Sequence, residues 1–478
     1  KGGLANVSFV SHNAASRDVD VSANAILIVD EAHRFRNPRT KRYGWLSDAA
    51  THSDILLLTA TPIANSIWDL YHLLSVFLPD HALRGWSGKD LRDAFEGSET
   101  DQFDLTQLLV HVCVRRMSAS VGFSQPSAKL QVLEYQAPED ESWLWKNLDS
   151  QIADVSFELL RQDWPNGLLR QYISRRWEAG PEALLETLNY LTEFHERWLE
   201  VTRAGGTLAR GEFKNLFGEE HRQNVFPFMF ESIPEPELAA DQPPASTQGQ
   251  TANLQAIEND LAKLNALRTR AEYACQNSGI ATAIAGLYEE VPKKLLVFTS
   301  FVPAAEGLFR SLVGALGSQV SIGLLTGQRA SATGLGKVGS HELLQRFAPS
   351  AQGSTTIPTH QEIDILIATD CISEGTNLQD CSRIVLADLP YSPLTVEQRV
   401  GRLIRPGSTA LEVKIYLPRP KDWNDTLGLR TRLLSKMEAA DSAGSSYRNI
   451  WDSRPAQSHS NPLRLLTDLD ALIAKHPD

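Results

Sequence analysis

Short apolar segments recur along the chain, and most of them end in polar residues or in a turn. Their apolar positions are consecutive rather than alternating, which is typical of parallel strands that are buried on both faces of a sheet. We interpret seven segments in this way, namely residues 7–11, 26–30, 55–61, 295–301, 322–327, 365–370 and 383–390.

Helical periodicity occupies the intervals between these segments. In residues 65–78, and again in residues 305–316, apolar side chains recur every three or four positions. A third amphipathic pattern runs from Leu254 to Leu267. Strands that alternate with helices predict an α/β fold built around parallel sheets.

The predicted strands form two groups, which predicts two α/β lobes. Residues 140–230 between the groups are rich in Trp, Arg and Glu without a strand-like segment, and they predict a helical insert. Residues 233–251 are rich in Pro, Gln and Ser, which is typical of a disordered connector. We therefore expect the C-terminal part of a first lobe at 1–130, a helical insert at 131–232, a disordered linker at 233–252, a second lobe at 253–420 and a helical extension at 421–478.

Composition and charge argue against a membrane protein and against a disulfide-stabilised secreted protein. No apolar segment approaches the ~20 residues that span a bilayer, so we expect no membrane partner. The four cysteines include no CxxC pair, and we interpret them as reduced thiols of a cytoplasmic protein. The net charge of −12 gives no overall basic field, so binding to nucleic acid would require a local basic cleft.

The polar residues after the segment at 26–29 carry the strongest chemical signal. Asp30 and Glu31 follow the apolar residues directly, and His33 comes two residues later. At the carboxyl end of a parallel strand, both carboxylates reach the crevice where such sheets bind ligands. Asp30 can coordinate Mg²⁺, and Glu31 can orient or deprotonate an attacking water. The alternative is a pair of solvated carboxylates at a strand end.

Two other predicted strands also end in polar residues. Thr59-Ala60-Thr61 follows the second strand, where the hydroxyl groups can hydrogen-bond to a neighbouring carboxylate or to His33. Thr369 and Asp370 follow the strand at 365–368 and lead into a loop with Gly375 and Asn377. Gly375 would let the backbone approach a ligand closely, and the polar residues around it could sense a phosphate.

Three arginines follow at regular spacing. Arg399, Arg402 and Arg405 stand three residues apart, so on a helix they would share one broad face. Three unpaired guanidinium groups at this spacing would repel one another, and we expect an anionic partner. Phosphate matches the planar fork of arginine, and an arginine at a γ-phosphate stabilises the charge of the transition state. A solvated basic face is the alternative.

The order of these segments resembles the superfamily 2 helicases and translocases. "DEAH" (30–33), "TAT" (59–61), "LLVFTSF" (295–301), "ATDCISEGTNL" (368–378) and "QRVGRLIR" (398–405) follow one another as in that superfamily. Within it, the chain resembles the Swi/Snf-type translocases and most closely the bacterial RapA-like group. The resemblance implies two RecA-like lobes, the first of them incomplete here, with ATP and Mg²⁺ as cofactors and double-stranded DNA as the partner.

The resemblance also implies a role for each matching residue. Asp30 and Glu31 would hold the metal and the water, and Arg402 and Arg405 would be the catalytic arginines. The residues implied near the nucleotide are Gln398, Gly375, Glu374 and His33. The residues implied to couple hydrolysis to movement are Thr59, Ala60 and Thr61, together with His33. The residues implied to contact nucleic acid are Ser11, Ser300, Thr326 and Thr369.

The phosphate-binding loop that such an enzyme needs is missing from the sequence. The pattern G-x-x-x-x-G-K-[ST] should precede Asp30, and none of the 29 residues before it matches. Residues 332–339, "ATGLGKVG", resemble it, but Val338 stands where a hydroxyl should bind Mg²⁺, and we expect a surface loop. Three explanations stay open: an N-terminally truncated fragment, which a start at Lys1 favours, a loop from a separate polypeptide, or a degenerate binding scaffold.

The helical insert allows two interpretations. Arginines interleaved with aromatic residues can bind nucleic acid through phosphate contacts and stacking. The interpretation that we prefer is a helical protrusion with a Trp-rich core and a solvated arginine face. The tryptophans concerned are Trp143, Trp145, Trp164, Trp177 and Trp198.

Two functions from different classes follow. The first is a fragment of an ATP-dependent nucleic-acid translocase that remodels protein complexes on double-stranded DNA. The second is a hydrolytically inactive module that binds DNA or protein. Because the phosphate-binding loop is missing, we expect the chain by itself to hydrolyse no ATP.

Overall fold

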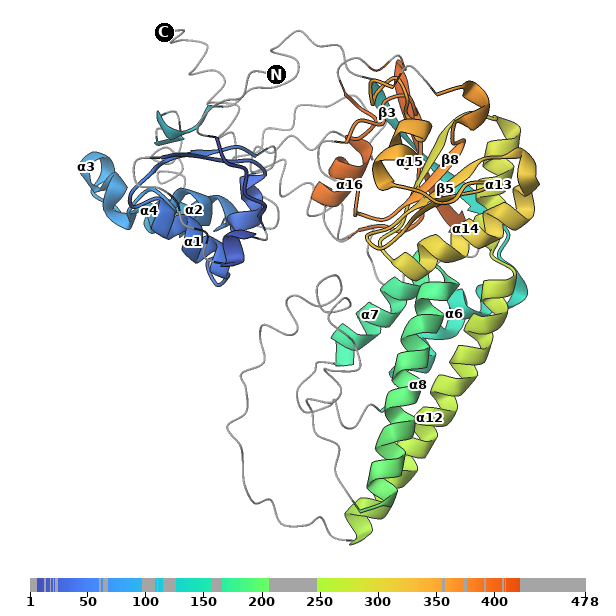
Figure 1. Cartoon of the computed structure of the whole chain (residues 1–478). Helices are drawn as coiled ribbons and strands as arrows, with labels where there is room; N and C mark the ends of the chain where they lie inside the picture. The colour runs from blue at the N-terminus through green and yellow to red at the C-terminus, as the bar shows by residue number, and fades with distance from the viewer. Residues whose placement is uncertain are drawn as a thin grey trace. The chain divides into compact units, whose positions relative to one another are not determined.

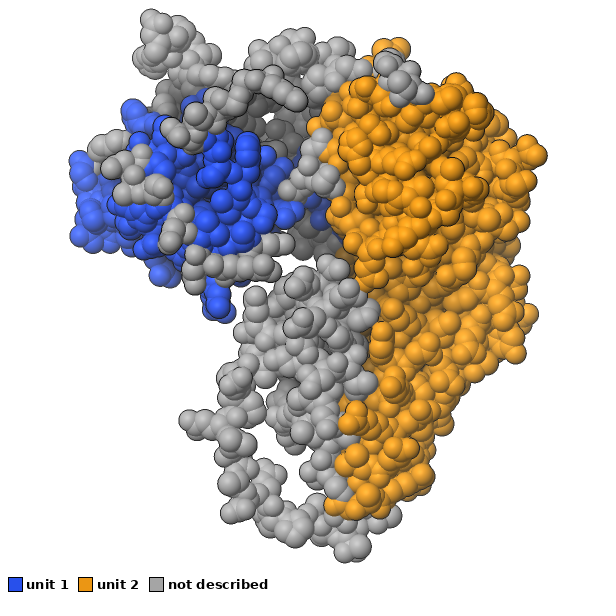
Figure 2. Space-filling model, in the orientation of Figure 1, with its two compact units in different colours: residues 1–125, 390–398, 429–478 blue, residues 126–389, 399–428 orange. Residues whose placement is uncertain are grey.

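The chain folds into two compact units, shown by colour in Figure 2. Unit 1 comprises residues 1–125, 390–398 and 429–478, and unit 2 comprises residues 126–389 and 399–428. The computed structural model describes residues 7–12, 14–17, 19, 21, 25–59, 62, 68–96, 108–109, 111–114, 126–156, 166–205, 247–354, 357–372, 376–390, 393–405, 408 and 410–421.

Unit 1 is built around two parallel strands. They are β1 (Ile26–Val29) and β2 (Asp54–Leu57), and Ile26 pairs with Asp54 while Val29 pairs with Leu57. The described helices of this unit are the 3-10 turns η1 (Ala14–Arg17), η2 (Ala32–Phe35) and η3 (Asp80–Leu83) and the α-helices α1 (Lys41–Ala49), α2 (Trp68–Leu74), α3 (Arg84–Ser87) and α4 (Leu91–Glu96). Thr40 begins α1, because its side chain accepts a hydrogen bond from Tyr43 N.

The two faces of the β1–β2 sheet differ in burial. Val29 packs with Phe35 of η2 and Leu46 of α1 in a small core. The opposite face leaves Ile26 73% exposed and Ile28 60% exposed. The prediction of burial on both faces is therefore wrong for these two strands over the residues that the structure describes. A strand at 7–11 is also wrong, because these residues are described without a strand.

Unit 2 contains an eight-stranded, mostly parallel sheet with the order β3-β10-β9-β4-β8-β5-β6-β7. The strands are β3 (Ser127–Tyr135), β4 (Leu295–Phe298), β5 (Ile322–Leu325), β6 (Ala330–Ala332), β7 (Gly336–Lys337), β8 (Ile365–Ala368), β9 (Arg383–Leu386) and β10 (Glu412–Pro420). Every residue of β4, β5, β8 and β9 is buried, as their continuous apolar sequences predicted. The predicted α/β fold class is confirmed.

Helices pack against the sheet, and the side chains between helices and sheet form the core of the lobe (Figure 1). They are α13 (Gly279–Glu290), α14 (Val302–Leu316) and α15 (Ser340–Phe347), with 3-10 turns η6 (Gly317–Gln319) and η7 (Thr359–Gln361). Helix α16 (Pro393–Val400) belongs to unit 1 as far as Gln398 and to unit 2 from Arg399. Ile284 of α13 and Leu308 of α14 pack against Val297 of β4. The predicted helix at 305–316 is confirmed as part of α14.

A helical arm projects from this lobe, with α8 and α12 running side by side in Figure 1. The arm consists of α6 (Glu139–Ala153), α7 (Asn166–Ala179), α8 (Pro181–Arg203) and α12 (Thr247–Gln276). The amphipathic pattern from Leu254 lies inside α12. Because α12 begins at Thr247, it takes in the end of the predicted linker, while residues 233–246 and 422–478 lie outside the described residues.

Two tryptophans of the arm are in its core, two more pack against it, and several of its arginines are ion-paired. Trp177 and Trp198 are buried among the leucines of α6, α7, α8 and α12. Side chains of Arg170, Arg203 and Arg270 lie 2.6–2.7 Å from carboxylates of Asp149, Glu258 and Asp140 respectively. For the described part of the arm, this confirms a Trp-rich core rather than aromatic groups free to stack on bases. Trp164 lies outside the described residues.

The base of the arm contacts the lobe through Phe301, the residue before α14. The guanidinium carbon of Arg176 on α7 lies 4.5 Å from the centre of the Phe301 ring. Ala179 and Ala183 of the arm pack with Phe301 and Ala304 in one buried cluster. The small side chains let α8 approach α14 closely, so the arm and the lobe share a packed interface.

None of the helices that the structure describes has an apolar stretch long enough to cross a membrane.

Candidate functional site

The carboxyl ends of β1 and β2 bring several predicted site residues together. Leu58 N donates to Val29 O, and Ala32 N donates to Leu58 O, at 2.8 and 2.9 Å. These bonds continue the strand pairing beyond β2 and hold the two strand ends side by side. Asp30 is exposed at this edge, and the His33 side chain is buried against it.

His33 connects the carboxylate of Glu31 with the hydroxyl of Thr59. His33 Nδ1 lies 3.2 Å from Glu31 Oε2 and 3.3 Å from Thr59 Oγ1. The structure therefore brings Glu31, His33 and Thr59 together. Ala60 and Thr61 lie outside the described residues.

Glu31 has an unusual backbone conformation. Its φ of 48° and ψ of 46° are left-handed, and among the described residues other than glycine it alone has a positive φ. Such a conformation costs on the order of 1–3 kcal/mol and persists where the surroundings enforce it. Here the Glu31 amide donates to Asp30 Oδ1 at 2.9 Å. The Asp30 carboxylate therefore stabilises the turn in which Glu31 lies.

The residues present fit a Mg²⁺ ion that arrives with a nucleotide. Among the described residues, no group of three His, Cys, Asp or Glu side chains could hold a metal ion by itself. Magnesium usually keeps several waters and binds one or two carboxylates plus substrate phosphates. An exposed Asp30 at a strand end suits that role and does not form a resident metal site.

The arginine segment differs from its prediction at Arg399. Helix α16 ends at Val400, so Arg402 and Arg405 lie in the turn that follows it. The Arg399 side chain is buried and forms two hydrogen bonds with the Asp370 carboxylate, at 2.7 and 2.8 Å, and one with the Asp388 carboxylate at 3.3 Å. The prediction that Arg399 is unpaired and faces an anionic partner is therefore wrong, because carboxylates inside unit 2 neutralise its charge.

Arg402 and Arg405 remain candidates for phosphate binding. The carbonyl of Arg402 accepts a hydrogen bond from Leu378 N at 3.0 Å, and Arg405 Nε donates to Gly401 O at 3.2 Å. Partial burial lowers the pKa of Arg405 from its ordinary value. Gln398 is half-buried, and Glu374 and Gly375 lie outside the described residues.

Three of the four residues implied to contact nucleic acid have side chains that form hydrogen bonds within the protein. Ser300 Oγ donates to Asp388 Oδ1 at 2.7 Å. Thr326 Oγ1 accepts from Arg329 N at 3.1 Å and closes the turn after β5. Thr369 is buried after β8, and Ser11 is exposed and accepts from Ala14 N. A contact of these four residues with nucleic acid stays a prediction.

The segment that resembles a phosphate-binding loop is a β-hairpin. Residues 333–335 turn between β6 and β7, which pair antiparallel with Ala332 opposite Gly336. Gly334 and Gly336 have φ values of 74° and 70°, which this tight turn requires. No helix follows the turn directly, so its amides cannot form the helix N-terminus that binds phosphate in such loops.

Sequence reasoning missed Asp388, which lies at the end of β9. Its carboxylate accepts hydrogen bonds from Thr299 Oγ1 at 2.8 Å and from Ser300 N at 2.6 Å. Burial alone would raise the pKa of Asp388, but the Arg399 charge and the Ser300 hydrogen bonds hold it below its ordinary value. The rule that singled out Asp30, a carboxylate at the end of a buried strand, would also have found Asp388.

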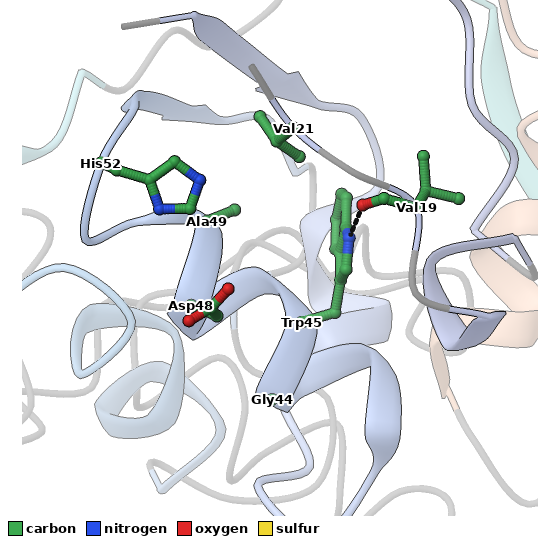
Figure 3. A pocket seen from close by; sticks show the side chains of 7 residues that line it. All are labelled: Val19, Val21, Gly44, Trp45, Asp48, Ala49 and His52. Atoms are coloured by element: carbon green, nitrogen blue, oxygen red, sulfur yellow. Dashed lines mark hydrogen bonds between the residues drawn. The ribbon is translucent and has the colours of Figure 1, made fainter. Parts of the chain in front are cut away.

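Unit 1 also contains a cavity of about 380 Å³ beside α1 (Figure 3). Trp45 Nε1 donates to Val19 O at 2.6 Å across it. Asp48 and His52 contribute its polar groups. None of the predicted site residues lines this cavity, so it adds no catalytic candidate.

Two families of known domains match the chain. Residues 8–171 match the SNF2-related domain, and residues 281–407 match the helicase conserved C-terminal domain. This order of domains is that of the superfamily 2 helicases and translocases. Within that superfamily, the chain belongs to the Swi/Snf type.

Individual relatives are distant. The chain is 22% identical to the uncharacterized ATP-dependent helicase YqhH of Bacillus subtilis over 394 residues, which are 82% of this chain and 55% of YqhH. It is 27% identical to the RNA polymerase-associated protein RapA of Yersinia pestis over 177 residues, which are 35% of this chain and 18% of RapA. The chain thus spans about half the length of the first relative and less than a fifth of the second.

A solved structure, the C-terminal part of the Fun30 ATPase domain, is similar at 12% sequence identity with a TM-score of 0.31. The match covers 73% of this chain and 99% of that one.

Proposed function

We propose that the intact protein is an ATP-driven translocase that moves along double-stranded DNA in the cytoplasm and remodels protein complexes on it. The observation that carries this proposal is the linkage of Glu31, His33 and Thr59 at the carboxyl ends of β1 and β2. Through His33, a change in the contacts of the Glu31 carboxylate can alter the position of Thr59 at the end of β2. Membership of the Swi/Snf type supports ATP as the fuel.

Each residue has a distinct task in this proposal. Mg²⁺ supplies charge neutralisation at the phosphates when it is bound. Asp30 would hold this ion, and Glu31 orients the attacking water and accepts its proton. Arg402 and Arg405 provide positive charge for the phosphoryl group in the transition state. His33 restrains the Glu31 side chain. When the contacts of Glu31 change during hydrolysis, His33 moves and alters its contact with Thr59.

The test is DNA-stimulated ATP hydrolysis by the full-length protein that contains this chain. Arg405→Ala should lower kcat by about 10³-fold, the magnitude typical of a catalytic arginine. Glu31→Gln should lower kcat by about 10²–10⁴-fold, because it removes the base and keeps the size of the side chain. Full activity in either variant would contradict the assigned roles. Double-stranded DNA, single-stranded DNA and RNA as activators then identify the partner.

A second function is favoured by one observation, the absence of a G-x-x-x-x-G-K-[ST] pattern from the sequence. In this proposal the 478-residue chain binds DNA or a protein and hydrolyses nothing. ATP hydrolysis by the purified chain, lost in Glu31→Gln, would exclude it. DNA binding by the chain should weaken steeply as salt increases.

A further inference from the structure

The ends of three adjacent strands in unit 2 converge on one buried guanidinium group. Ser300 follows β4, Asp370 follows β8 and Asp388 follows β9, and each contacts Arg399. The side chains of Arg399 and Asp388 are each only 2% exposed. A buried arginine of this kind needs full compensation, since a charge in the interior is costly unless it is paired and hydrogen-bonded.

The compensation is complete. Arg399 forms five hydrogen bonds, with Asp370 Oδ1, Asp370 Oδ2, Asp388 Oδ1, Asp388 O and Ser300 Oγ. Its guanidinium carbon also lies 5.4 Å from the centre of the Phe298 ring. An arginine has five N–H groups. Arg399 is therefore committed to the protein and is not a phosphate ligand, in contrast to what its spacing from Arg402 and Arg405 suggests.

The same residue begins the turn that carries the two candidate catalytic arginines. Arg402 N donates to Arg399 O at 3.3 Å, and Leu403 N donates to Val400 O at 3.0 Å. Further along, Leu378 N donates to Arg402 O at 3.0 Å. The segment 399–405 is thus held at its start by the Arg399 side chain and in its middle by the loop after β8.

We propose that Arg399 is a positioning residue, and that its clamp on Asp370, Asp388 and Ser300 sets the place of Arg402 and Arg405 relative to the strand ends. The effect on ATP hydrolysis rests on the proposed function, but the structural effect does not. The planar fork is essential to this role, because it contacts two carboxylates and a hydroxyl at fixed angles. A lysine keeps the charge but loses that geometry.

The first test is hydrogen exchange on the 478-residue chain, read by mass spectrometry. In Arg399→Lys, the amides of residues 402–405 should exchange at least about tenfold faster, while β4, β8 and β9 keep their protection. Arg383→Lys is the matched control, because Arg383 is also buried but donates to Leu287 O and Val291 O. Unchanged exchange at 402–405, or equal loss of protection over the whole sheet, would overturn the proposal.

The second test is steady-state ATP hydrolysis by the full-length protein. Arg399→Lys should lower kcat by about 10–100-fold with little change in KM for ATP, since a displaced catalytic arginine acts in the transition state. The decisive comparison is Arg399→Lys in an Arg405→Ala background. If Arg399 acts through Arg405, the second substitution should have almost no further effect on kcat.

The outcomes separate the two proposals. If the unaltered protein hydrolyses no ATP, the proposed function fails and the exchange result alone decides the role of Arg399. If it hydrolyses ATP and Arg399→Lys keeps the full kcat, the positioning role is wrong. If the losses from Arg399→Lys and Arg405→Ala multiply in full, Arg399 acts on folding or on another group, and the proposal is again overturned.

Discussion

At the scale of single residues, the left-handed backbone of Glu31 makes a measurable prediction. Glu31→Gly and Glu31→Ala both remove the carboxylate and both should abolish hydrolysis. Only glycine adopts the left-handed conformation without steric cost, so Glu31→Gly should be about 1 kcal/mol more stable than Glu31→Ala. Urea denaturation of the two variants measures the difference. If alanine is equally stable, the φ of 48° carries no strain.

The base of the arm contains a buried carboxyl group whose pKa is raised. Glu182 on α8 lies against Gly307 of α14, where an added Cβ would overlap its carboxyl group. Burial raises the pKa of Glu182 to about 7, opposed by the charge of Arg310 and increased by that of Glu141. The folded state therefore holds the proton more tightly than the unfolded chain does.

It follows that the stability of unit 2 should fall as pH rises between about 4.5 and 7, where the folded carboxyl group gives up its proton. Glu182→Gln, which stays neutral, should remove this part of the pH dependence and should be roughly 1–3 kcal/mol more stable at pH 8. Denaturation at pH 5, 6, 7 and 8 provides the measurement. Glu193→Gln, at an exposed position of the same helix, is the control.

Motif residues and clamp residues differed in how well the sequence predicted them. Asp30, Glu31 and His33 are close in sequence and directly follow an apolar strand, so their proximity could be predicted. Arg399 was predicted to be unpaired because its partners are distant in sequence, Asp370 by 29 positions and Asp388 by 11. Only the order of strands in the folded sheet brings those carboxylates to it.

At the scale of elements, the exposed face of β1 and β2 is the clearest departure from prediction. Ile28 and Leu56 are 60% and 49% exposed on that face. Contiguous exposed apolar surface promotes association. We expect the isolated chain to bind a hydrophobic dye and to self-associate, and Ile28→Lys with Leu56→Lys to reduce both without loss of stability. Leu27→Lys on the buried face is the matched control and should unfold unit 1.

The strands of unit 2 show which sequence patterns are sufficient to predict a strand. β4, β5, β8 and β9 were predicted because a strand buried on both faces is continuously apolar. β3 was missed because it alternates exposed and partly buried positions, and β10 was missed because Pro418 and Pro420 argue against a strand. An apolar sequence alone was not enough at residues 7–11, where Phe9 is 96% exposed.

At the scale of the whole molecule, we predict that unit 2 needs strand β3 in order to fold. It pairs with β10 in parallel from Ser127 opposite Glu412 to Tyr135 opposite Pro420. A fragment of residues 126–421 should therefore fold by itself. A fragment of residues 136–421 lacks β3 and also loses the 2.5 Å hydrogen bond from Tyr135 to Glu141.

We expect the shorter fragment to be several kcal/mol less stable, or unfolded, because it uncovers one side of β10 and leaves the buried Glu141 without one of its donors. Circular dichroism and urea denaturation of the two fragments decide the matter. Equal stability would show that β3 is dispensable and would favour a unit that starts nearer to the arm.

The contact between Arg176 and Phe301 has a mechanical consequence. Helices α8 and α12 contain 23 and 30 residues, so they extend roughly 35–45 Å from the base of the arm. A force at their far end acts at the base with that leverage, as a torque on the loop that holds Phe301. Ser300, the residue before Phe301, accepts a hydrogen bond from Arg399. Any load on the arm would therefore act beside the contacts of Arg399, the residue that we propose positions Arg402 and Arg405.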